Sequence, residues 1–129
     1  IIHLAITLGV AVAYFFILSK DAIANFKIPT IDSDSIVFVL IPVIAIVLSN
    51  FMFKNMISKI DSKLSDEAKI NAFQTSSIIR WAILEGAALV LLFLKPDFFI
   101  FGIIIIIYLL TIRPTEDKVN NDLNLTSKL

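Results

Sequence analysis

Four apolar runs, separated by polar segments, constrain the fold of this 129-residue chain more than any other feature. The runs cover residues 1–18, 36–53, 78–94 and 98–112. Each is close to the roughly 17–25 residues that an α-helix needs to cross the hydrocarbon core of a bilayer. None alternates with the period of two that is typical of membrane β-barrel strands. We therefore predict an all-α membrane protein with four transmembrane helices, because backbone groups in lipid must bond within the chain.

The composition supports this class. Hydrophobic residues make up 58% of the chain, against about 45–50% in soluble domains, and a short soluble chain could not bury that much apolar surface. The length predicts one domain over residues 1–129. There is no cysteine, so disulfides and thiolate metal sites are excluded, and we expect no cofactor. The formal net charge of zero gives no general attraction to nucleic acid.

Lysine and arginine predict the orientation, because they concentrate on the cytoplasmic side of membrane proteins. The second loop and the C-terminal tail are the richer side, with Lys54, Lys59, Lys63, Lys69, Arg113, Lys118 and Lys128. The other side holds only Lys20, Lys27 and Lys95. We predict that both ends of the chain are cytoplasmic (N-in, C-in) in a multi-pass protein.

The cytoplasmic segment 54–77 retains helical spacing of its apolar residues, which predicts a helical hairpin extension. We expect helices over 36–64 and 66–94 that meet in a tight turn. Ser65 is suited to cap the second of these helices, followed by acids at Asp66 and Glu67 where the helix dipole favours them. Asp34 is a candidate cap for the helix that begins near residue 36.

The last two apolar runs are separated only by Lys95-Pro96-Asp97, so we expect them to be antiparallel neighbours. After Arg113-Pro114 the cytoplasmic tail, residues 113–129, can form a short amphipathic helix. That helix would place Val119 and Leu123 against the inner membrane surface.

The chain also contains an internal similarity. Residues 1–9 align without gaps on residues 78–86, and the two segments share an Ala-x-x-x-Gly pattern, at Ala5 and Gly9 and at Ala82 and Gly86. This favours two parallel helical-hairpin repeats related by a pseudo-twofold axis along the membrane normal. Small residues four apart let helices approach closely in lipid. They predict a contact between the first and third spans or, alternatively, a contact between subunits.

Glu85 is the residue that most invites a functional interpretation. It lies about 10 Å inside the third span, counted from residue 78 at roughly 1.5 Å per residue, and an ionisable group there is costly and commonly functional. Other polar residues of the inner half form a candidate intramembrane site with it: Thr7, Ser49, Asn50, Arg80, Tyr108 and His3.

Two interpretations of Glu85 remain open. Its carboxyl could hydrogen-bond to Asn50, Ser49 or Thr7 and hold helices together, or the group could form a proton or cation relay. Arg80 lies about 140° around the helix from Glu85, so we expect it to extend to the inner headgroups instead. His3 has no second ligand nearby in sequence, so no metal site is predicted.

The aromatic residues Tyr14 and Trp81 lie toward the ends of their spans, where such rings often act as interfacial anchors. Phosphate loops, nucleotide-binding fingerprints and serine–histidine–acid sets are absent from the sequence, so we do not expect an enzyme.

The segment 79–89, with Glu85-Gly86, resembles the carboxylate helix of the rotor proteolipids of rotary ATPases. The glycine-rich first helix and the Arg-Gln-Pro loop of those proteins are absent, which argues against that family. The patterns around residues 78–89 and 113–123 are similar to a family of small, uncharacterised bacterial four-helix membrane proteins. That resemblance implies the bacterial inner membrane and no known activity.

These observations predict a non-enzymatic membrane bundle that acts as an oligomeric or accessory subunit of a membrane complex. Its expected partners are the lipid bilayer and either further copies of itself or a larger assembly. The alternative is a small proton or cation channel, or an ion-coupled transporter, that uses Glu85.

Overall fold

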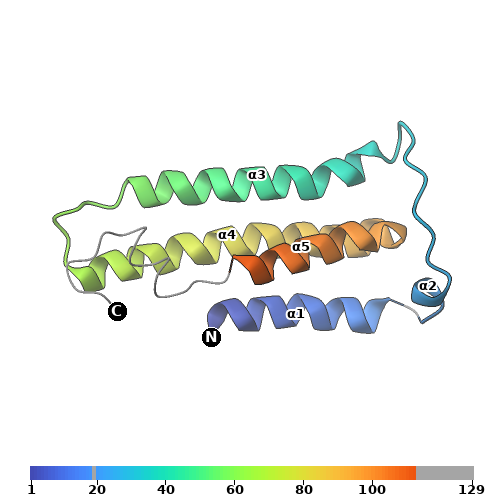
Figure 1. The fold of residues 1–129 in the computed structure, drawn as a ribbon, viewed down its shortest axis with the longest axis horizontal. Coiled ribbons are helices and arrows are strands. Elements are labelled where there is room, and N and C mark those ends of the chain that lie inside the picture. Colours follow the sequence, from blue (N-terminus) through green and yellow to red (C-terminus); the bar gives the residue numbers. More distant parts are fainter. Residues whose placement is uncertain (19, 113–129) are drawn as a thin grey trace.

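The computed structural model describes residues 1–18 and 20–112, and these ranges contain helices and no β-strand. The helices are α1 (Ile2–Ile17), α2 (Lys20–Ala24), α3 (Ile36–Ser58), α4 (Asp66–Leu94) and α5 (Phe99–Thr111), with a 3-10 turn (Pro96–Phe98) before α5. The four long helices run alternately in opposite directions (Figure 1). The start of α1 and the end of α5 point toward the end of the bundle that holds the α3–α4 turn, and that turn extends well beyond them (Figure 1).

Helix α4 is the centre of the bundle, because its contacts with α1, α3 and α5 are the most extensive, although α5 also touches the three other long helices. Its side chains Leu84, Leu91 and Leu92 are fully buried, together with Ile105 and Leu109 of α5. Helices α4 and α5 form a closely packed antiparallel hairpin, as predicted, whereas α1 and α3 lie on opposite sides of that pair (Figure 1). The two halves of the chain therefore do not form two matching hairpins in this structure.

Helix α4 begins and ends where the sequence predicts. The Ser65 hydroxyl accepts a hydrogen bond from the Ala68 backbone N–H at 3.3 Å, and Asp66 and Glu67 occupy the first turn. The prediction for α3 was wrong at its C-terminal end, because the helix stops at Ser58 and not at residue 64. The Asp61 carboxylate accepts a hydrogen bond from the Lys63 N–H at 2.9 Å, and such local bonds compete with the helical pattern.

The predicted cap Asp34 does not cap α3: the N-cap residue is Ser35, which makes no side-chain cap bond, and Asp32 holds the turn before it. The Asp32 carboxylate accepts hydrogen bonds from the Ser35 N–H at 2.8 Å and from the Ser35 hydroxyl at 2.7 Å. It also accepts a longer bond, at 3.2 Å, from the Asp34 N–H. Asp32 therefore closes the turn that leads into the helix.

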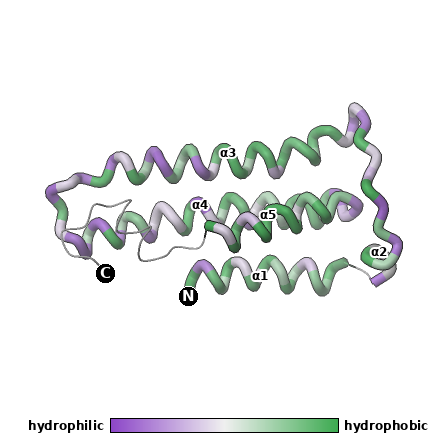
Figure 2. Tube along the Cα trace, viewed as in Figure 1, coloured by the Kyte–Doolittle hydropathy of each residue, from purple (hydrophilic) through white to green (hydrophobic). Residues whose placement is uncertain are grey.

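The outer surface of the bundle is apolar. All four long helices expose large hydrophobic side chains, including Leu8, Val47, Phe93 and Ile107. Hydrophilic residues gather at the loops and along the end of α3 and α4 near their connecting turn (Figure 2). By length and composition, α3 and α4 could cross a membrane, whereas α1 and Pro96–Thr111 are shorter apolar helices.

The predicted cytoplasmic tail, residues 113–129, and its amphipathic helix with Val119 and Leu123 lie outside the described residues. The basic residues of that tail, on which the orientation partly depends, lie there as well.

Candidate functional site

Three polar side chains from three helices meet inside the bundle. The Arg80 guanidinium of α4 donates hydrogen bonds through Nη2 to Asn50 Oδ1 of α3 at 2.5 Å and to the Tyr108 hydroxyl of α5 at 3.2 Å. The Asn50 amide donates in turn to the Tyr108 hydroxyl at 2.6 Å. These three residues, called the Arg80 network below, connect α3, α4 and α5.

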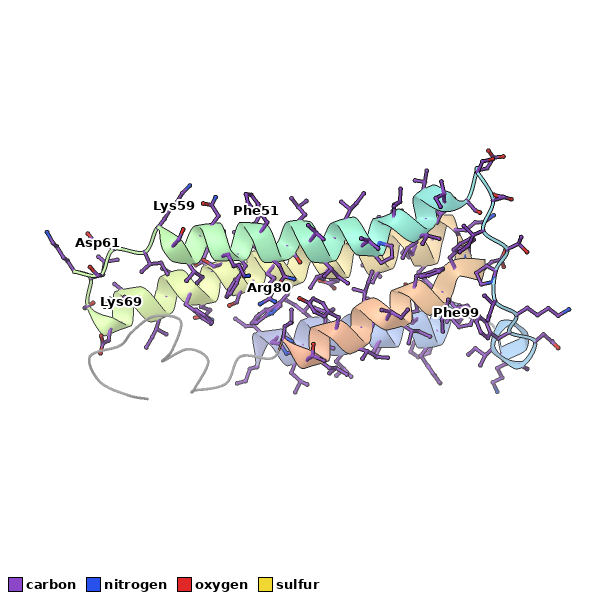
Figure 3. The ribbon with its side chains drawn as sticks, turned by 45° about the horizontal axis from the view of Figure 1, so that its top comes forward. Phe51, Lys59, Asp61, Lys69, Arg80 and Phe99 are labelled. Atoms are coloured by element: carbon purple, nitrogen blue, oxygen red, sulfur yellow. The ribbon has the colours of Figure 1, made fainter. Side chains whose placement is uncertain are left out.

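The Arg80 guanidinium points into the bundle. Its Cζ lies 4.7 Å from the centroid of the Phe53 ring, a distance at which a cation is attracted to an aromatic face. Within the described part of the chain, Nε is buried and has no hydrogen-bond partner. The expectation that Arg80 extends to the headgroups was wrong, because Asn50, Tyr108 and Phe53 hold it. Figure 3 shows Arg80 between the helices.

His3 forms a second polar contact, between α1 and the end of α5. Its side chain is 5% exposed, and Nε2 lies 2.6 Å from the Leu109 carbonyl oxygen. Because a carbonyl only accepts, Nε2 must carry the proton in this bond. The last carbonyls of a helix have no partner within the helix, so His3 satisfies one of them. Its ring also meets Trp81 edge to face, with centroids 4.8 Å apart.

Ser49 and Thr7 are both buried and both bond to their own helix. The Thr7 hydroxyl donates to the His3 carbonyl at 2.9 Å, and the Ser49 hydroxyl donates to the Ile46 carbonyl at 3.1 Å. Their donor capacity is therefore used locally.

Glu85 stands apart from these groups. It is half-buried on α4, and no hydrogen bond or ion pair to its carboxyl is made by the residues that the structure describes. The predicted bond from Glu85 to Asn50, Ser49 or Thr7 is absent. The reason is rotational: Arg80, not Glu85, lies on the side of α4 that faces α3 and α5, so Asn50 and Tyr108 bond to the arginine.

The predicted small-residue contact between the first and third spans is also absent. Ala5, Gly9, Ala82 and Gly86 are exposed, and a Cβ added at Gly9 or Gly86 would meet no atom within 4 Å. Helix α1 packs on α4 through another face, which carries His3, Thr7, Val10 and Tyr14. The alternative, a contact between subunits, remains a prediction.

The glycine that is closely approached is Gly102 of α5. A Cβ at this position would overlap the ring and the hydroxyl of Tyr14. Tyr14 is 4% exposed and its hydroxyl donates to the Ala88 carbonyl at 2.5 Å. Tyr14 and Trp81, expected as interfacial anchors, are thus buried inside the chain. The spacing of His3, Thr7, Val10 and Tyr14 is a helical-face signal in the sequence that predicts this packing.

The buried face of α4 continues into its polar extension. Lys69, Ser76 and Ser77 are all buried there. The Ser76 hydroxyl donates to the Ala72 carbonyl at 2.9 Å.

The chemistry available in the Arg80 network is limited. A guanidinium, an amide and a phenol provide hydrogen-bond donors and acceptors but no carboxylate or imidazole that could act as a base. Among the described residues, no group of three or more His, Asp or Glu side chains could hold a metal ion. Comparisons with protein-family models, curated proteins and solved structures find no match to this chain, and the resemblance to small bacterial membrane proteins stays a prediction.

Proposed function

We propose that this chain is a multi-pass integral membrane protein that acts as a non-enzymatic subunit of a larger membrane assembly or of a homo-oligomer. The observation that carries the membrane assignment is the distribution of polarity. Large apolar side chains are exposed on all four long helices, while Arg80, Asn50, His3 and Thr7 turn inward. Water would disfavour that outer surface, whereas lipid chains would cover it at no cost.

In this proposal all four long helices cross a cytoplasmic membrane. Helix α1 has 16 residues and α5 has 13, so they reach about 24 Å and about 20 Å at roughly 1.5 Å per residue. Both fall short of a hydrocarbon core of about 30 Å. Local thinning of the bilayer accommodates short spans at modest cost, and the 3-10 turn lengthens the last span.

The exposed face of α4 supports assembly. Ala82 and Gly86 leave a shallow strip on which a second helix backbone can approach closely. Glu85 lies next to this strip and has no partner among the described residues. A docked helix that supplies a hydrogen-bond donor would remove the cost of burying that carboxyl.

Gly86→Leu tests the assembly proposal, because the single chain has room for the larger side chain whereas a docked helix would not. We expect the variant to fold and to lose its high-mass species in mild detergent. The dissociation constant of the assembly should rise at least tenfold, measured by native mass spectrometry and by co-purification. Val47→Leu, on the exposed face of α3, is the matched control. Wild-type protein that is strictly monomeric and co-purifies with nothing would refute the proposal.

The unpaired carboxyl of Glu85 favours a second candidate function, proton or cation movement. In liposomes, Glu85→Gln would then abolish the flux, whereas Glu67→Gln, at the exposed start of α4, would leave it intact. Flux that is equal in wild type and in Glu85→Gln would remove this candidate.

A further inference from the structure

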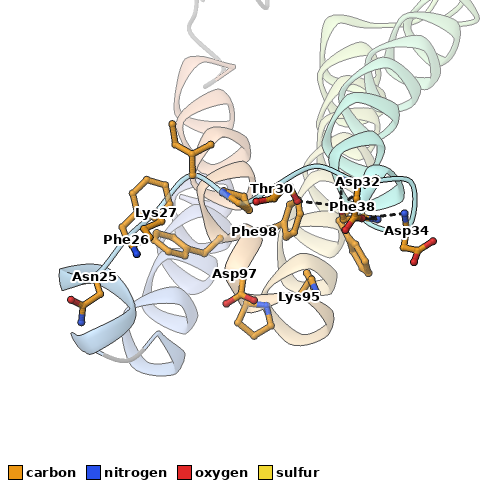
Figure 4. Close-up of a pocket in the computed structure, with 15 residues that line it drawn as sticks. Asn25, Phe26, Lys27, Thr30, Asp32, Asp34, Phe38, Lys95, Asp97 and Phe98 are labelled. Atoms are coloured by element: carbon orange, nitrogen blue, oxygen red, sulfur yellow. Dashed lines mark hydrogen bonds between the residues drawn. The ribbon is translucent and has the colours of Figure 1, made fainter.

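A cavity of about 810 Å³ lies at the end of the bundle opposite the α3–α4 turn. It lies, open on one side, between the segment 25–35, which leads into α3, and the α4–α5 turn (Figure 4). Its volume lies in the range of roughly 300–1,000 Å³ that is common for small-molecule sites. Neither the subunit function proposed above nor the Glu85 alternative uses this cavity.

Aromatic rings give the cavity an apolar floor. Phe98 and Phe99 are buried at the start of α5, and two rings pack on them from the other wall. Phe26 meets Phe99 with centroids 5.1 Å apart, and Phe38 meets Phe98 at 5.9 Å. The Phe26–Phe99 contact holds the start of the segment 25–35 on the bundle, and Phe38 of α3 lies just beyond its end, so the cavity has two anchored walls.

Charges of both signs line the same space. Lys27 and Asp34 contribute from one wall, and Lys95 and Asp97 contribute from the other. Their side chains make no hydrogen bond or ion pair within the residues that the structure describes. The Asp32 carboxylate, by contrast, is occupied by its bonds to Ser35.

The rim of the cavity is continuous with the apolar outer surface. Ile28 is 84% exposed and Ile31 is 50% exposed, both in the segment that forms one wall. A ligand with a charged group in the cavity could therefore extend an apolar part along the outside of the bundle.

We propose that this cavity binds the headgroup of a zwitterionic phospholipid that carries a phosphate and a primary amine. Lys27 and Lys95 pair with the phosphate, and Asp97 pairs with the ammonium group. The aromatic floor contacts the glycerol and the first methylenes, and the acyl chains leave across Ile28. The acyl-chain part of this proposal rests on the proposed membrane location.

The experiment titrates the full chain, purified in a lipid-free detergent, with dioctanoyl phosphatidylethanolamine and detects the complex by native mass spectrometry. Dioctanoyl phosphatidylglycerol lacks the amine and so measures its contribution to binding. Phosphoethanolamine and inorganic phosphate lack the acyl chains and so measure the contribution of the apolar part. We expect phosphatidylethanolamine to bind at one molecule per chain and at least tenfold more tightly than the other three.

Two sets of variants locate the site. Lys27→Gln combined with Lys95→Gln should weaken phosphatidylethanolamine binding at least tenfold. Lys20→Gln combined with Lys54→Gln removes the same charge from exposed positions outside the cavity and should leave binding unchanged. Asp97→Asn should reduce the preference for phosphatidylethanolamine over phosphatidylglycerol. Circular dichroism of each variant confirms that it is folded.

If the Lys27/Lys95 double variant binds phosphatidylethanolamine as tightly as wild type does, the assignment of the site to this cavity is wrong. It is also wrong if none of the probes binds. If inorganic phosphate binds as tightly as the phospholipid, the ligand is a phosphate group alone and not a phospholipid. These outcomes are separate from a failure of the membrane assignment, which alkaline carbonate extraction of cell membranes measures without added lipid.

Discussion

Arg80 is the charged residue whose surroundings are most specific to this fold. Its guanidinium offers five N–H donors and no acceptor, and in the described part of the chain the side chains that accept its hydrogen bonds are both neutral. The Phe53 ring adds an attraction to the cation. Because Asn50 and Tyr108 come from two other helices, the position of Arg80 depends on the correct packing of all three.

Asn50→Ala should therefore destabilise the bundle. It removes the 2.5 Å acceptor of Arg80 and a donor to Tyr108, and leaving such groups unsatisfied costs about 1–3 kcal/mol. Unfolding in mixed micelles with increasing SDS measures the change. Asn55→Ala, at an exposed site on the same helix, is the control and should stay near wild type. Equal stability of the two variants would mean that the Arg80 network does not support the fold.

Gly102→Ala should be destabilising by about 1–3 kcal/mol, because the added methyl group overlaps Tyr14 and overpacking costs this much. Gly9→Ala is the matched control, since nothing lies within 4 Å of its Cβ position. Alanine is preferred over glycine in helices by up to about 1 kcal/mol, so the control should be as stable as wild type or more so. The same SDS titration distinguishes them, and a stable Gly102→Ala variant would contradict this packing.

Membership of the polar site was largely predictable from the sequence, but the hydrogen-bond partner of each residue was not. Arg80, Asn50 and Tyr108 were all candidates for one polar site, and the structure brings these three together. Glu85 was expected at its centre and lies outside it. The partner of a residue depends on which face of α4 meets α3, and a helix that is apolar on most sides carries little information about its rotation.

At the scale of elements, the turn into α3 depends on Asp32. Its bonds from Ser35 lower the pKa of the Asp32 carboxyl below the usual 3.8. A lowered pKa means that the carboxylate stabilises the folded turn above pH 3.8 and loses this effect as the pH falls through the lower folded value. Amide hydrogen exchange at Ser35 and Ile36 should therefore become faster in acid, relative to unstructured peptide.

Asp32→Asn should remove that pH dependence, since the asparagine side chain does not titrate in this range. Asp34→Asn changes the neighbouring carboxyl, whose side chain accepts no hydrogen bond within the described residues, and should keep the wild-type profile. A wild-type profile that is flat below pH 3.8 would show that Asp32 does not stabilise this turn.

The ends of the helices were predicted best where side chains close to them in sequence determine them. Ser65 with Asp66 and Glu67 fixed the start of α4, and Lys95-Pro96 fixed its end. The end of α3 was missed because apolar spacing continued through Ile60 and Leu64 while the Asp61 side chain competed for the backbone. Asp32 and not Asp34 holds the turn before α3, because the Asp32 carboxylate is the one that reaches Ser35. The spacing of residues in the sequence does not distinguish the two.

At the scale of the whole molecule, the number and alternating direction of the four long helices followed from the apolar runs, whereas the short helix α2 and the arrangement of the helices did not. The internal similarity predicts equal hairpins, but α4 and α5 each contact all the other long helices, whereas α1 and α3 pack mainly on that pair. Identities such as Ala5 with Ala82 and Gly9 with Gly86 lie on exposed faces. Similar outward-facing residues are compatible with a shared lipid environment and so do not require a shared packing arrangement.

The orientation of the whole bundle can be measured with single cysteines, because the natural chain has none. Ser62→Cys lies in the α3–α4 turn and Ser33→Cys lies in the segment before α3, at opposite ends of the bundle, and both sites are exposed. If the proposed membrane topology is correct, a membrane-impermeant maleimide should label Ser33→Cys in spheroplasts and Ser62→Cys only in inverted vesicles.

Val47→Cys is the control for burial in lipid, because this side chain is 63% exposed in the middle of α3. A bilayer around α3 should protect the new thiol in both preparations until detergent is added, whereas a water-exposed bundle would leave it reactive throughout. Labelling of both loop variants from the same side would contradict the orientation that the lysines predict. Rapid labelling of Val47→Cys without detergent would contradict the membrane assignment itself, since an exposed apolar face on α3 requires lipid or a protein partner to cover it.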